Sequence, residues 1–193
     1  MTESSNTASP ASASPSALRA DPIALALDHW VEHGWHAAAD GMALVTSVMR
    51  VQQVFLARVE AVLRPRGLTF ARFEVLRLLG FSRTGTLPIG KIGQRLQVHA
   101  ASVTNAVQRL EIDGCVERRP NPHDGRSVLV TLTDTGRSLV ERCTVELNAE
   151  VFGSLPLAID RQRDVFDALR DVRERYGDWV QPVTELEIAR EQR

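Results

Sequence analysis

Long apolar runs are missing from this 193-residue chain. No stretch approaches the roughly 18 apolar residues that a membrane-spanning helix needs, which argues against an integral membrane protein. Residues 1–20 are mostly Ser, Ala, Thr and Pro, and they lack the basic start and the apolar stretch of a signal peptide. We therefore expect a disordered tail on a cytoplasmic protein that has no membrane partner.

Cysteine is scarce, with only Cys115 and Cys143. Two thiols do not build a disulfide-rich scaffold, and they fit a reduced compartment. No Ser-His-Asp order, phosphate-binding loop or pair of catalytic carboxylates stands out, so we predict neither an enzyme nor a bound cofactor. Apolar residues make up 44% of the chain, which is enough to form a core. Aromatic residues make up only 5%, and the sequence shows no strand-rich pattern.

Net charge is small, at −1, but its distribution is uneven. Residues 50–137 carry fourteen Lys or Arg and seven Asp or Glu, whereas the rest of the chain carries nine and seventeen. A basic middle between acidic ends suits a face that meets a polyanion such as DNA. Chance clustering is the alternative, because charge asymmetry is a weak signal.

Helical periodicity predicts a mainly α fold with one small β element. Asp21, Thr69 and Thr133 have the side chains of helix N-caps. The predicted helices cover about residues 22–40, 42–63, 69–81, 88–96, 100–113, 133–152 and 160–176. Two short strands are predicted at residues 115–120 and 127–132, on either side of a turn-rich hairpin tip at residues 121–126.

This order of elements predicts a winged helix-turn-helix, whose second helix enters the DNA major groove. In the predicted helix over residues 100–113, apolar residues recur on one side, which we expect to be buried in the core: Val103, Val107 and Leu110. The opposite side of the helix carries small and amide side chains, which we expect to contact the edges of the bases: Ala101, Ser102, Asn105 and Gln108. Thr104 lies at the edge of that side, where its hydroxyl is expected to reach a phosphate. An ordinary solvated helix face is the alternative.

The predicted hairpin tip supplies a second contact to DNA. Arg126 can insert its guanidinium into the minor groove, and Asp124 can pair with it and fix its orientation. Arg118 and Arg119 lie on the first strand near the same end. The alternative is a solvated turn with a local salt bridge.

The stretch SVTNAVQRLEIDGCVERRPNPHDGRSVLVTLTDTGRSLV resembles the multiple antibiotic resistance regulator (MarR) family. In the family's order, it has Arg-Leu-Glu at residues 109–111, Gly114, Asp-x-Arg at residues 124–126 and Leu-Thr-x-x-Gly at residues 132–136. The preceding LTFARFEVLRLL resembles a further helix of the family. The resemblance covers about residues 42–176. It implies a homodimer, joined through its N- and C-terminal helices, that binds a palindromic operator as a ligand-responsive repressor.

The domain division follows from this resemblance. We divide the chain into a tail (1–20), N-terminal dimerisation helices (21–63), a DNA-binding lobe (64–137) and C-terminal dimerisation helices with a polar tail (138–193).

A helix that carries Trp30 near the N-terminus resembles the urate-responsive branch of the family. Trp30, Glu74 and Arg118 can occupy three of its four ligand positions, although Glu74 replaces an aspartate and Ala106 stands where the branch has an arginine. With these departures we do not predict urate. We predict a small, anionic, aromatic effector in a seam between the N-terminal helices, the third predicted helix and the start of the wing, where Arg72 adds a cation. The alternative is that Trp30 only packs its helix onto the dimer core.

The sequence allows three further interpretations. The spacing of His29, His33 and His36 places three imidazoles on one helical face, but that face is opposite the apolar one, so we predict no metal site. We expect Cys115 and Cys143 to pack in the core, and an oxidant sensor that works through either thiol is the alternative. A protein-interaction module that reuses the winged-helix scaffold without binding DNA is the other alternative.

Overall fold

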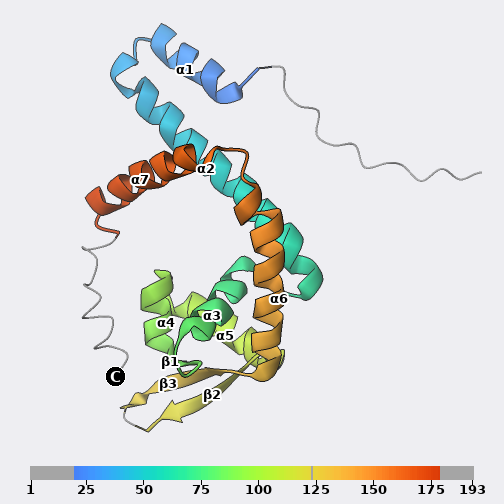
Figure 1. Cartoon of the computed structure of the whole chain (residues 1–193). Helices are drawn as coiled ribbons and strands as arrows, with labels where there is room; N and C mark the ends of the chain where they lie inside the picture. Colours follow the sequence, from blue (N-terminus) through green and yellow to red (C-terminus); the bar gives the residue numbers. More distant parts are fainter. Residues whose placement is uncertain (1–19, 123, 179–193) are drawn as a thin grey trace, which may run out of the picture. The chain divides into compact units, whose positions relative to one another are not determined.

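The computed structural model describes residues 20–122 and 124–178, except for the side chain of Arg126 (Figure 1). The chain forms two compact units, residues 1–55 and residues 56–193. Almost all of the predicted N-terminal tail and the last part of the predicted C-terminal tail lie outside the described residues. None of the described helices combines the length and the apolar composition that a membrane crossing requires.

The N-terminal unit consists of α1 (Pro22–Glu32) and the first part of α2 (His36–Leu63). Asp21 caps α1 as predicted, because its carboxylate accepts a hydrogen bond from the backbone N–H of Ile23 at 2.9 Å. The predicted continuation of this helix to residue 40 is wrong. Gly34 adopts a left-handed φ of 81°, which interrupts the helix, so α2 begins at residue 36 rather than at residue 42.

The second unit contains the winged helix-turn-helix. Its helices, after the end of α2, are α3 (Phe70–Phe81), α4 (Ile89–Leu96), α5 (Ala100–Ile112), α6 (Asp134–Glu150) and α7 (Ile159–Arg175), with short 3-10 helices at Arg64–Arg66 and Phe152–Ser154. Its strands are β1 (Thr86–Pro88), β2 (Val116–Asn121) and β3 (Asp124–Leu132). The predicted fold class, mainly α with a small β-wing, is confirmed.

The sheet is antiparallel and has the strand order β1-β3-β2. β2 and β3 form the predicted wing hairpin and extend further toward its tip than expected, with Asn121 paired to Asp124. β1 was not predicted. It pairs Thr86 with Thr131 of β3, and the two hydroxyl oxygens lie 3.0 Å apart. A strand of three residues is too short for a periodic signal, so it is defined by its pairing with β3.

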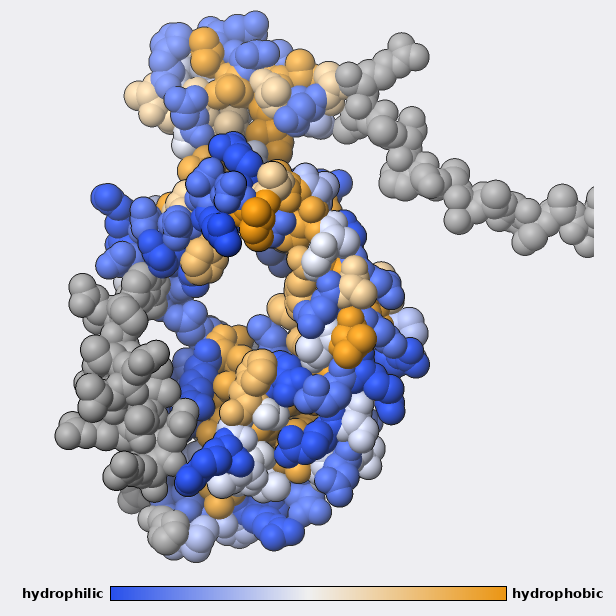
Figure 2. Space-filling model, in the orientation of Figure 1, coloured by the Kyte–Doolittle hydropathy of each residue, from blue (hydrophilic) through white to orange (hydrophobic). Residues whose placement is uncertain are grey.

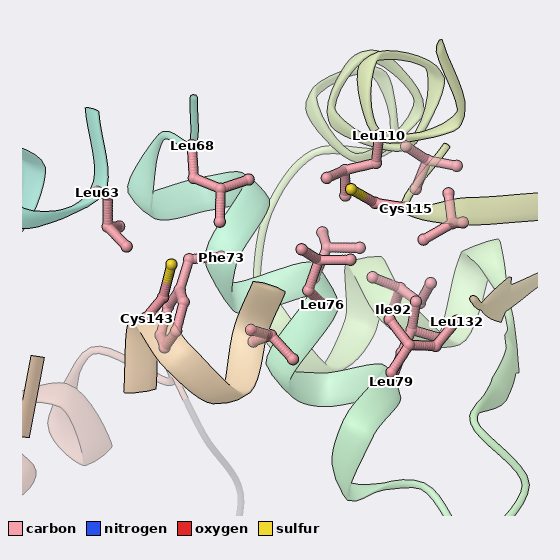
Figure 3. Close-up of a cluster of buried hydrophobic side chains, with 14 of the residues drawn as sticks. Leu63, Leu68, Phe73, Leu76, Leu79, Ile92, Leu110, Cys115, Leu132 and Cys143 are labelled. Atoms are coloured by element: carbon pink, nitrogen blue, oxygen red, sulfur yellow. The ribbon is translucent and has the colours of Figure 1, made fainter. Parts of the chain in front are cut away.

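An apolar core joins α3, α5 and α6 (Figure 3). The predicted stripe of α5 is buried in it: Val103, Val107 and Leu110. Figure 3 shows Cys143 of α6 beside Phe73 of α3, and Cys115 close to Leu110. Because the core holds α5 along one side only, the opposite side of this helix stays open to a partner.

The wing is fastened to α6 through a close contact of backbones. The hydroxyl of Thr133 accepts a hydrogen bond from the N–H of Gly136 at 3.0 Å and donates one to the carbonyl of Gly114 at 2.8 Å. The backbone N–H of Thr133 also donates to the carbonyl of Cys115, at 3.1 Å. A Cβ on Gly136 would lie 2.1 Å from that same carbonyl oxygen, so only glycine fits at this position.

Candidate nucleic-acid interface

α4 and α5 meet at a sharp turn. Gln97 ends α4 with a left-handed φ of 54°, and its backbone N–H donates to the carbonyl of Gly93. A Cβ on Gly93 would lie only 3.3 Å from the Val103 side chain, which shows that the two helices pack closely. This contact holds α5 against α4 in the arrangement of a helix-turn-helix.

The solvent-facing side of α5 carries the residues that were predicted to contact DNA. All five are exposed: Ala101, Ser102, Thr104, Asn105 and Gln108. The Thr104 hydroxyl donates to the carbonyl of Ala100 at 2.9 Å. Its proton is therefore engaged within the helix, and a hydrogen bond from Thr104 to a phosphate would require that bond to break.

A groove of about 520 Å³ runs between the start of α3 and the exposed side of α5. Its lining consists of Thr69, Ala71, Arg72, Ser102, Asn105, Ala106, Arg109 and Asp113. Arg109 was missed in the sequence analysis, where it was treated only as part of a family motif. It is the only basic residue of α5, it is exposed, and it lies one turn beyond Asn105 on the helix, so its charge and spacing were the available signal.

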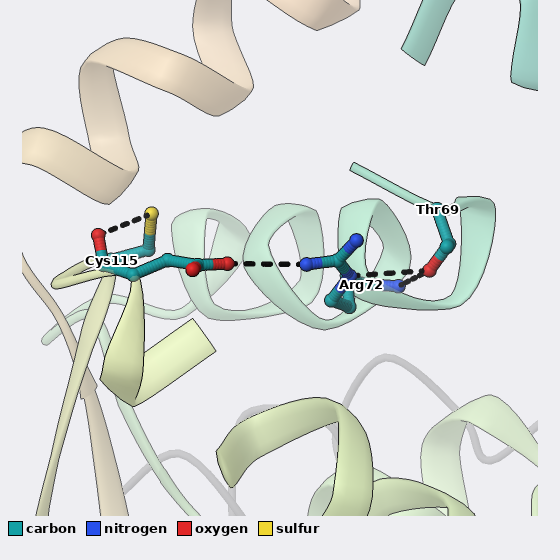
Figure 4. Close-up of polar contacts among 4 residues, drawn as sticks. Thr69, Arg72 and Cys115 are labelled. Carbon is teal, nitrogen blue, oxygen red and sulfur yellow. Dashed lines mark hydrogen bonds and ion pairs between the residues drawn. The ribbon is translucent and has the colours of Figure 1, made fainter. Parts of the chain in front are cut away.

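Arg72, which lines this groove, makes the contacts that Figure 4 shows. Its backbone N–H and its Nε both lie 3.4 Å from the hydroxyl oxygen of Thr69, which caps α3. Its Nη1 pairs with a carboxylate oxygen of Asp113 at 3.1 Å. Arg118 is paired in the same way, because its Nε lies 2.7 Å from a carboxylate oxygen of Glu111. Both cations predicted to bind an effector are therefore already engaged by carboxylates at the end of α5.

The wing carries the remaining predicted DNA contacts. Asp124 lies in β3 next to the hairpin tip and is exposed. The backbone of Arg126 belongs to β3, but its side chain lies outside the described part of the chain, so its pairing with Asp124 stays a prediction. Arg119 forms an ion pair of 2.6 Å with Glu117 on the same strand, and both side chains are exposed.

The other two residues that were predicted to bind an effector, Trp30 and Glu74, are both half-buried. Trp30 lies in the N-terminal unit, half-buried, with its ring edge-to-face against Trp35 at 5.2 Å between centroids. Glu74 lies half-buried on α3, and burial raises the pKa of its carboxyl. The seam that was predicted to join Trp30 to Arg72, Glu74 and Arg118 remains a prediction.

Both thiols are in the core, as predicted, with Cys115 2% and Cys143 0% exposed. Burial raises the pKa of each thiol; Asp113 adds to the rise at Cys115, and Glu146 adds to it at Cys143. A thiol sensor needs an exposed thiolate, so the environment of both cysteines disfavours reaction with an oxidant.

The three histidines do not share a helical face, which corrects the sequence interpretation. α1 ends before His33, and His36 begins the next helix. The Nδ1 of His29 lies 3.1 Å from a carboxylate oxygen of Glu32, and the Nδ1 of His33 lies 2.8 Å from a backbone carbonyl oxygen. Among the described residues, no group of three His, Cys, Asp or Glu is placed to hold a metal ion.

Comparison with known proteins agrees with this geometry. A family model described as the MarR family matches residues 66–127. The transcriptional repressor Rv2887 of Mycobacterium tuberculosis is 32% identical over 111 residues, which cover 58% of this chain and 78% of the relative. The structure of Sco5413, a MarR family transcriptional regulator from Streptomyces coelicolor, has 48% identity and a TM-score of 0.67 over 74% of this chain and 99% of that one. A mutant of E. coli MarR complexed with operator DNA has 27% identity and a TM-score of 0.63, with coverages of 70% and 96%. On this similarity of sequence and fold, the chain belongs to the MarR family of transcription regulators.

Proposed function

We propose that this chain is a ligand-responsive repressor that binds palindromic duplex DNA as a homodimer. The observation that carries the DNA part is the polar, exposed side of α5 opposite its buried stripe. Asn105 and Gln108 offer the amides that pair with adenine, and Ala101 offers a methyl for a thymine. The operator complex of E. coli MarR, which has a similar fold, supports the same partner.

A gel-shift titration against the DNA upstream of the protein's own gene tests DNA binding. We expect a saturable shift at moderate salt that resists competitor DNA. If the chain changed the mobility of no duplex, or of all duplexes equally, the result would favour the alternative of a protein-interaction module on the same scaffold.

The roles of the individual contacts can be separated by two variants. Gln108→Ala is expected to relax the preference at one base pair by about 1–3 kcal/mol, because a base reader discriminates between sequences. Arg126→Ala is expected to weaken binding to all duplexes and to lower the slope of affinity against salt by about 1, because a cation in the groove displaces a counterion. If both variants changed every duplex equally, Gln108 would not be a base reader.

The homodimer is supported by apolar residues that a lone chain exposes. In α2 a stripe at helical spacing is 40–57% exposed, namely Leu44, Val48, Val51 and Phe55. In α7 a second set is 37–57% exposed, namely Val165, Phe166, Leu169 and Val172. Figure 2 shows hydrophobic residues reaching the surface of the N-terminal helices. Exposed apolar surface on this scale is typical of interfaces, and the family resemblance favours a second copy as the occupant.

The dimer is tested by light scattering coupled to size exclusion. Leu44→Glu is expected to produce monomers or weakened dimers, because it places a charge on the α2 stripe. Gln53→Glu adds a charge on the opposite side of the same helix and is the matched control. A wild-type chain that is monomeric at micromolar concentration, or two variants that behave alike, would contradict this interface.

The chain's response to a ligand is the part of its function that concerns release of DNA. The sequence predicts a seam with a flat apolar wall at Trp30 and cations at Arg72 and Arg118, which in the structure pair with Asp113 and Glu111 and would have to exchange those partners for a ligand. We expect Trp30→Phe to keep the fold and DNA binding but to reduce release of DNA by aromatic carboxylates. Release by peroxide and not by such ligands would instead favour the oxidant-sensing alternative, against the burial of both thiols.

A further inference from the structure

The last helix, α7, ends in contact with the helix-turn-helix. Gly177 takes a left-handed φ of 71°, and its N–H donates to the carbonyl of Glu174 at 2.9 Å. The N–H of Asp178 donates to the carbonyl of Arg173, also at 2.9 Å, which completes a Schellman motif and turns the chain away from the helix axis. The backbone carbonyl of Asp178 then accepts a hydrogen bond from the side-chain amide of Gln97, the residue that ends α4. The point at which the chain leaves α7 is therefore fastened to the DNA-binding lobe.

The same lobe carries a hollow of about 320 Å³ whose lining is apolar and cationic. Residues from α3, the turn after it, β1 and α4 form this lining, and none comes from α5: Leu78, Phe81, Ser82, Arg83, Thr84, Thr86, Leu87, Pro88 and Arg95. Leu78, Phe81 and Leu87 supply apolar surface, and Phe81 is 76% exposed. Arg83 and Arg95 are exposed, and within the described part of the chain neither forms an ion pair or a hydrogen bond through its side chain.

The sequence that follows α7 has the complementary composition. Residues 179–189 contain two glutamates and no lysine or arginine. At residues 185–188 the sequence is Glu-Leu-Glu-Ile, in which acidic and apolar side chains alternate. Alternate side chains of an extended chain point to opposite sides, so this stretch can present an apolar side and an acidic side to one surface.

The distance along the chain is sufficient for this stretch to reach the hollow. Leu186 is eight residues beyond Asp178, and eight extended residues span at most about 29 Å. Gln97, which holds the carbonyl of Asp178, is only two positions from Arg95 of the lining.

We propose that residues 179–189 dock in this hollow of their own chain and tie the end of α7 to the helix-turn-helix. Leu186 lies against the apolar walls, where it removes the exposed ring of Phe81 from water. The carboxylates of Glu185 and Glu187 pair with the two guanidinium groups that the described residues leave without a partner.

Phe81 is held in place for such a contact. The guanidinium of Arg77 lies 4.4 Å from the centroid of its ring. Arg77 itself is only 15% exposed and is anchored to α6, at 3.0 Å from a carboxylate oxygen of Glu141 and 3.4 Å from the hydroxyl of Thr144. A ring that is already fixed from one side loses little conformational entropy when a further side chain packs on it.

The consequence of docking for DNA rests on the proposed function. α4 packs closely against α5 through Gly93 and Val103, so the docked segment places two carboxylates next to the helix that supports the recognition helix. Carboxylates beside a phosphate backbone repel it. The segment is therefore an internal inhibitor, which lowers the affinity of the lobe for duplex DNA while it is docked.

A nitroxide label tests the docking in the full chain without DNA. It is attached to the thiol of the Ala189→Cys variant, because both native thiols are buried and react slowly. We expect the paramagnetic broadening of amide signals to centre on the lining of the hollow, at Phe81 and Thr84. A label on Ser12→Cys, in the opposite terminal segment, is the matched control and is expected to leave these signals sharp.

An exchange of charges separates this pairing from a general effect of charge. The double variant Arg83→Glu, Arg95→Glu is expected to abolish the broadening from the label at residue 189. Adding Glu185→Arg and Glu187→Arg to it is expected to restore the broadening, because the same two ion pairs then form with opposite polarity. Arg142→Glu reverses one exposed cation of α6, outside the hollow, and is expected to leave the broadening unchanged.

Three results of the label experiment would overturn the docking: no broadening, broadening centred on the α5 groove, or exchanged charges that do not restore it. A fourth is loss of the broadening when the labelled chain is diluted with an excess of unlabelled chain, since the occupant would then come from a second copy. None of these measurements contains DNA, so they do not depend on the proposed function.

A gel shift measures the inhibition. The double variant Glu185→Gln, Glu187→Gln is expected to bind duplex DNA about fivefold more tightly than the wild type, because it removes two carboxylates from beside the phosphates. Equal or weaker binding by this variant would overturn the inhibitory role. A wild-type chain and a variant that both shift no duplex would count against the proposed function, with the label experiment still deciding the docking.

Discussion

Substituting Gly136 with alanine is expected to destabilise the lobe by about 2–4 kcal/mol. The added Cβ would lie 2.1 Å from the carbonyl oxygen of Cys115 and 2.9 Å from a methyl carbon of Leu132. The obstacle at the shorter distance is backbone, and it cannot rotate away as the end of a side chain can. The start of α6 and the start of the wing must therefore move apart by more than about 1 Å, since non-bonded heavy atoms pack at about 3.5–4.0 Å.

The magnitude follows from what this movement breaks. Overpacking of a filled interior costs about 1–3 kcal/mol. Separation also stretches the hydrogen bonds of Thr133 to the carbonyls of Gly114 and Cys115, at 2.8 and 3.1 Å, each of which contributes about 1 kcal/mol. Alanine has a higher helix propensity than glycine, and this difference offsets about 1 kcal/mol of the total.

Urea unfolding followed by circular dichroism measures this difference in the free energy of unfolding. All variants are compared at one protein concentration, because the apparent stability of a dimer depends on its concentration. Gly90→Ala is the matched control, since it lies in α4 of the same lobe and its Cβ would meet nothing within 4 Å. We expect this control to match the wild type or to gain up to about 1 kcal/mol. Equal midpoints for the two alanine variants would refute the argument that backbone contact requires Gly136.

Three other outcomes are expected. Cys115 and Cys143 should react with Ellman's reagent in the native chain far more slowly than in urea, because both are buried and burial raises the pKa of each thiol; fast reaction at pH 7 would contradict this. Glu146→Gln should flatten the loss of stability between about pH 5 and pH 3: Arg66 lowers the pKa of the Glu146 carboxyl in the folded chain, so their ion pair stabilises above the ordinary carboxyl pKa and is lost as the pH falls through the folded value. An acid limb of the stability curve that is unchanged in this variant would argue against that pair. Removing residues 1–20 should leave the gel shift unchanged, and a lost shift would place a DNA contact in that segment.

Local chemistry explains the elements that could be predicted from the sequence. The caps at Asp21, Thr69 and Thr133 were recognisable because a short polar side chain precedes an apolar repeat, and each of them accepts a backbone hydrogen bond in the structure. The exposed side of α5 was predictable for the same reason, since Val103 and Val107 fix which side is buried.

The elements that were missed depend on contacts or dihedral angles that periodicity does not contain. Gly34 fits the apolar face of a continuous helix as well as it fits a break, and only its positive φ separates the two. β1 exists because Thr86 pairs with a strand about 45 residues further along the chain. The pairing of Arg72 with Asp113 is likewise formed between two helices, so the sequence presented a free cation where the structure has an ion pair.

Ion pairs of this kind reduce the number of cations in residues 50–137 that are free to neutralise DNA phosphates. Within the described residues, carboxylates lie 2.5–3.1 Å from six arginines of this stretch: Arg64, Arg66, Arg72, Arg77, Arg118 and Arg119. Arg109, by contrast, has no ion-pair partner among the described residues and lies on the exposed side of α5. Each phosphate that a protein cation neutralises adds roughly 0.9 to the slope of affinity against salt, so unpaired cations determine this slope more than the summed charge does. A slope on the operator that exceeds the number of unpaired cations in the two chains of a dimer would therefore mean that some of the six paired arginines exchange a carboxylate for a phosphate when DNA binds.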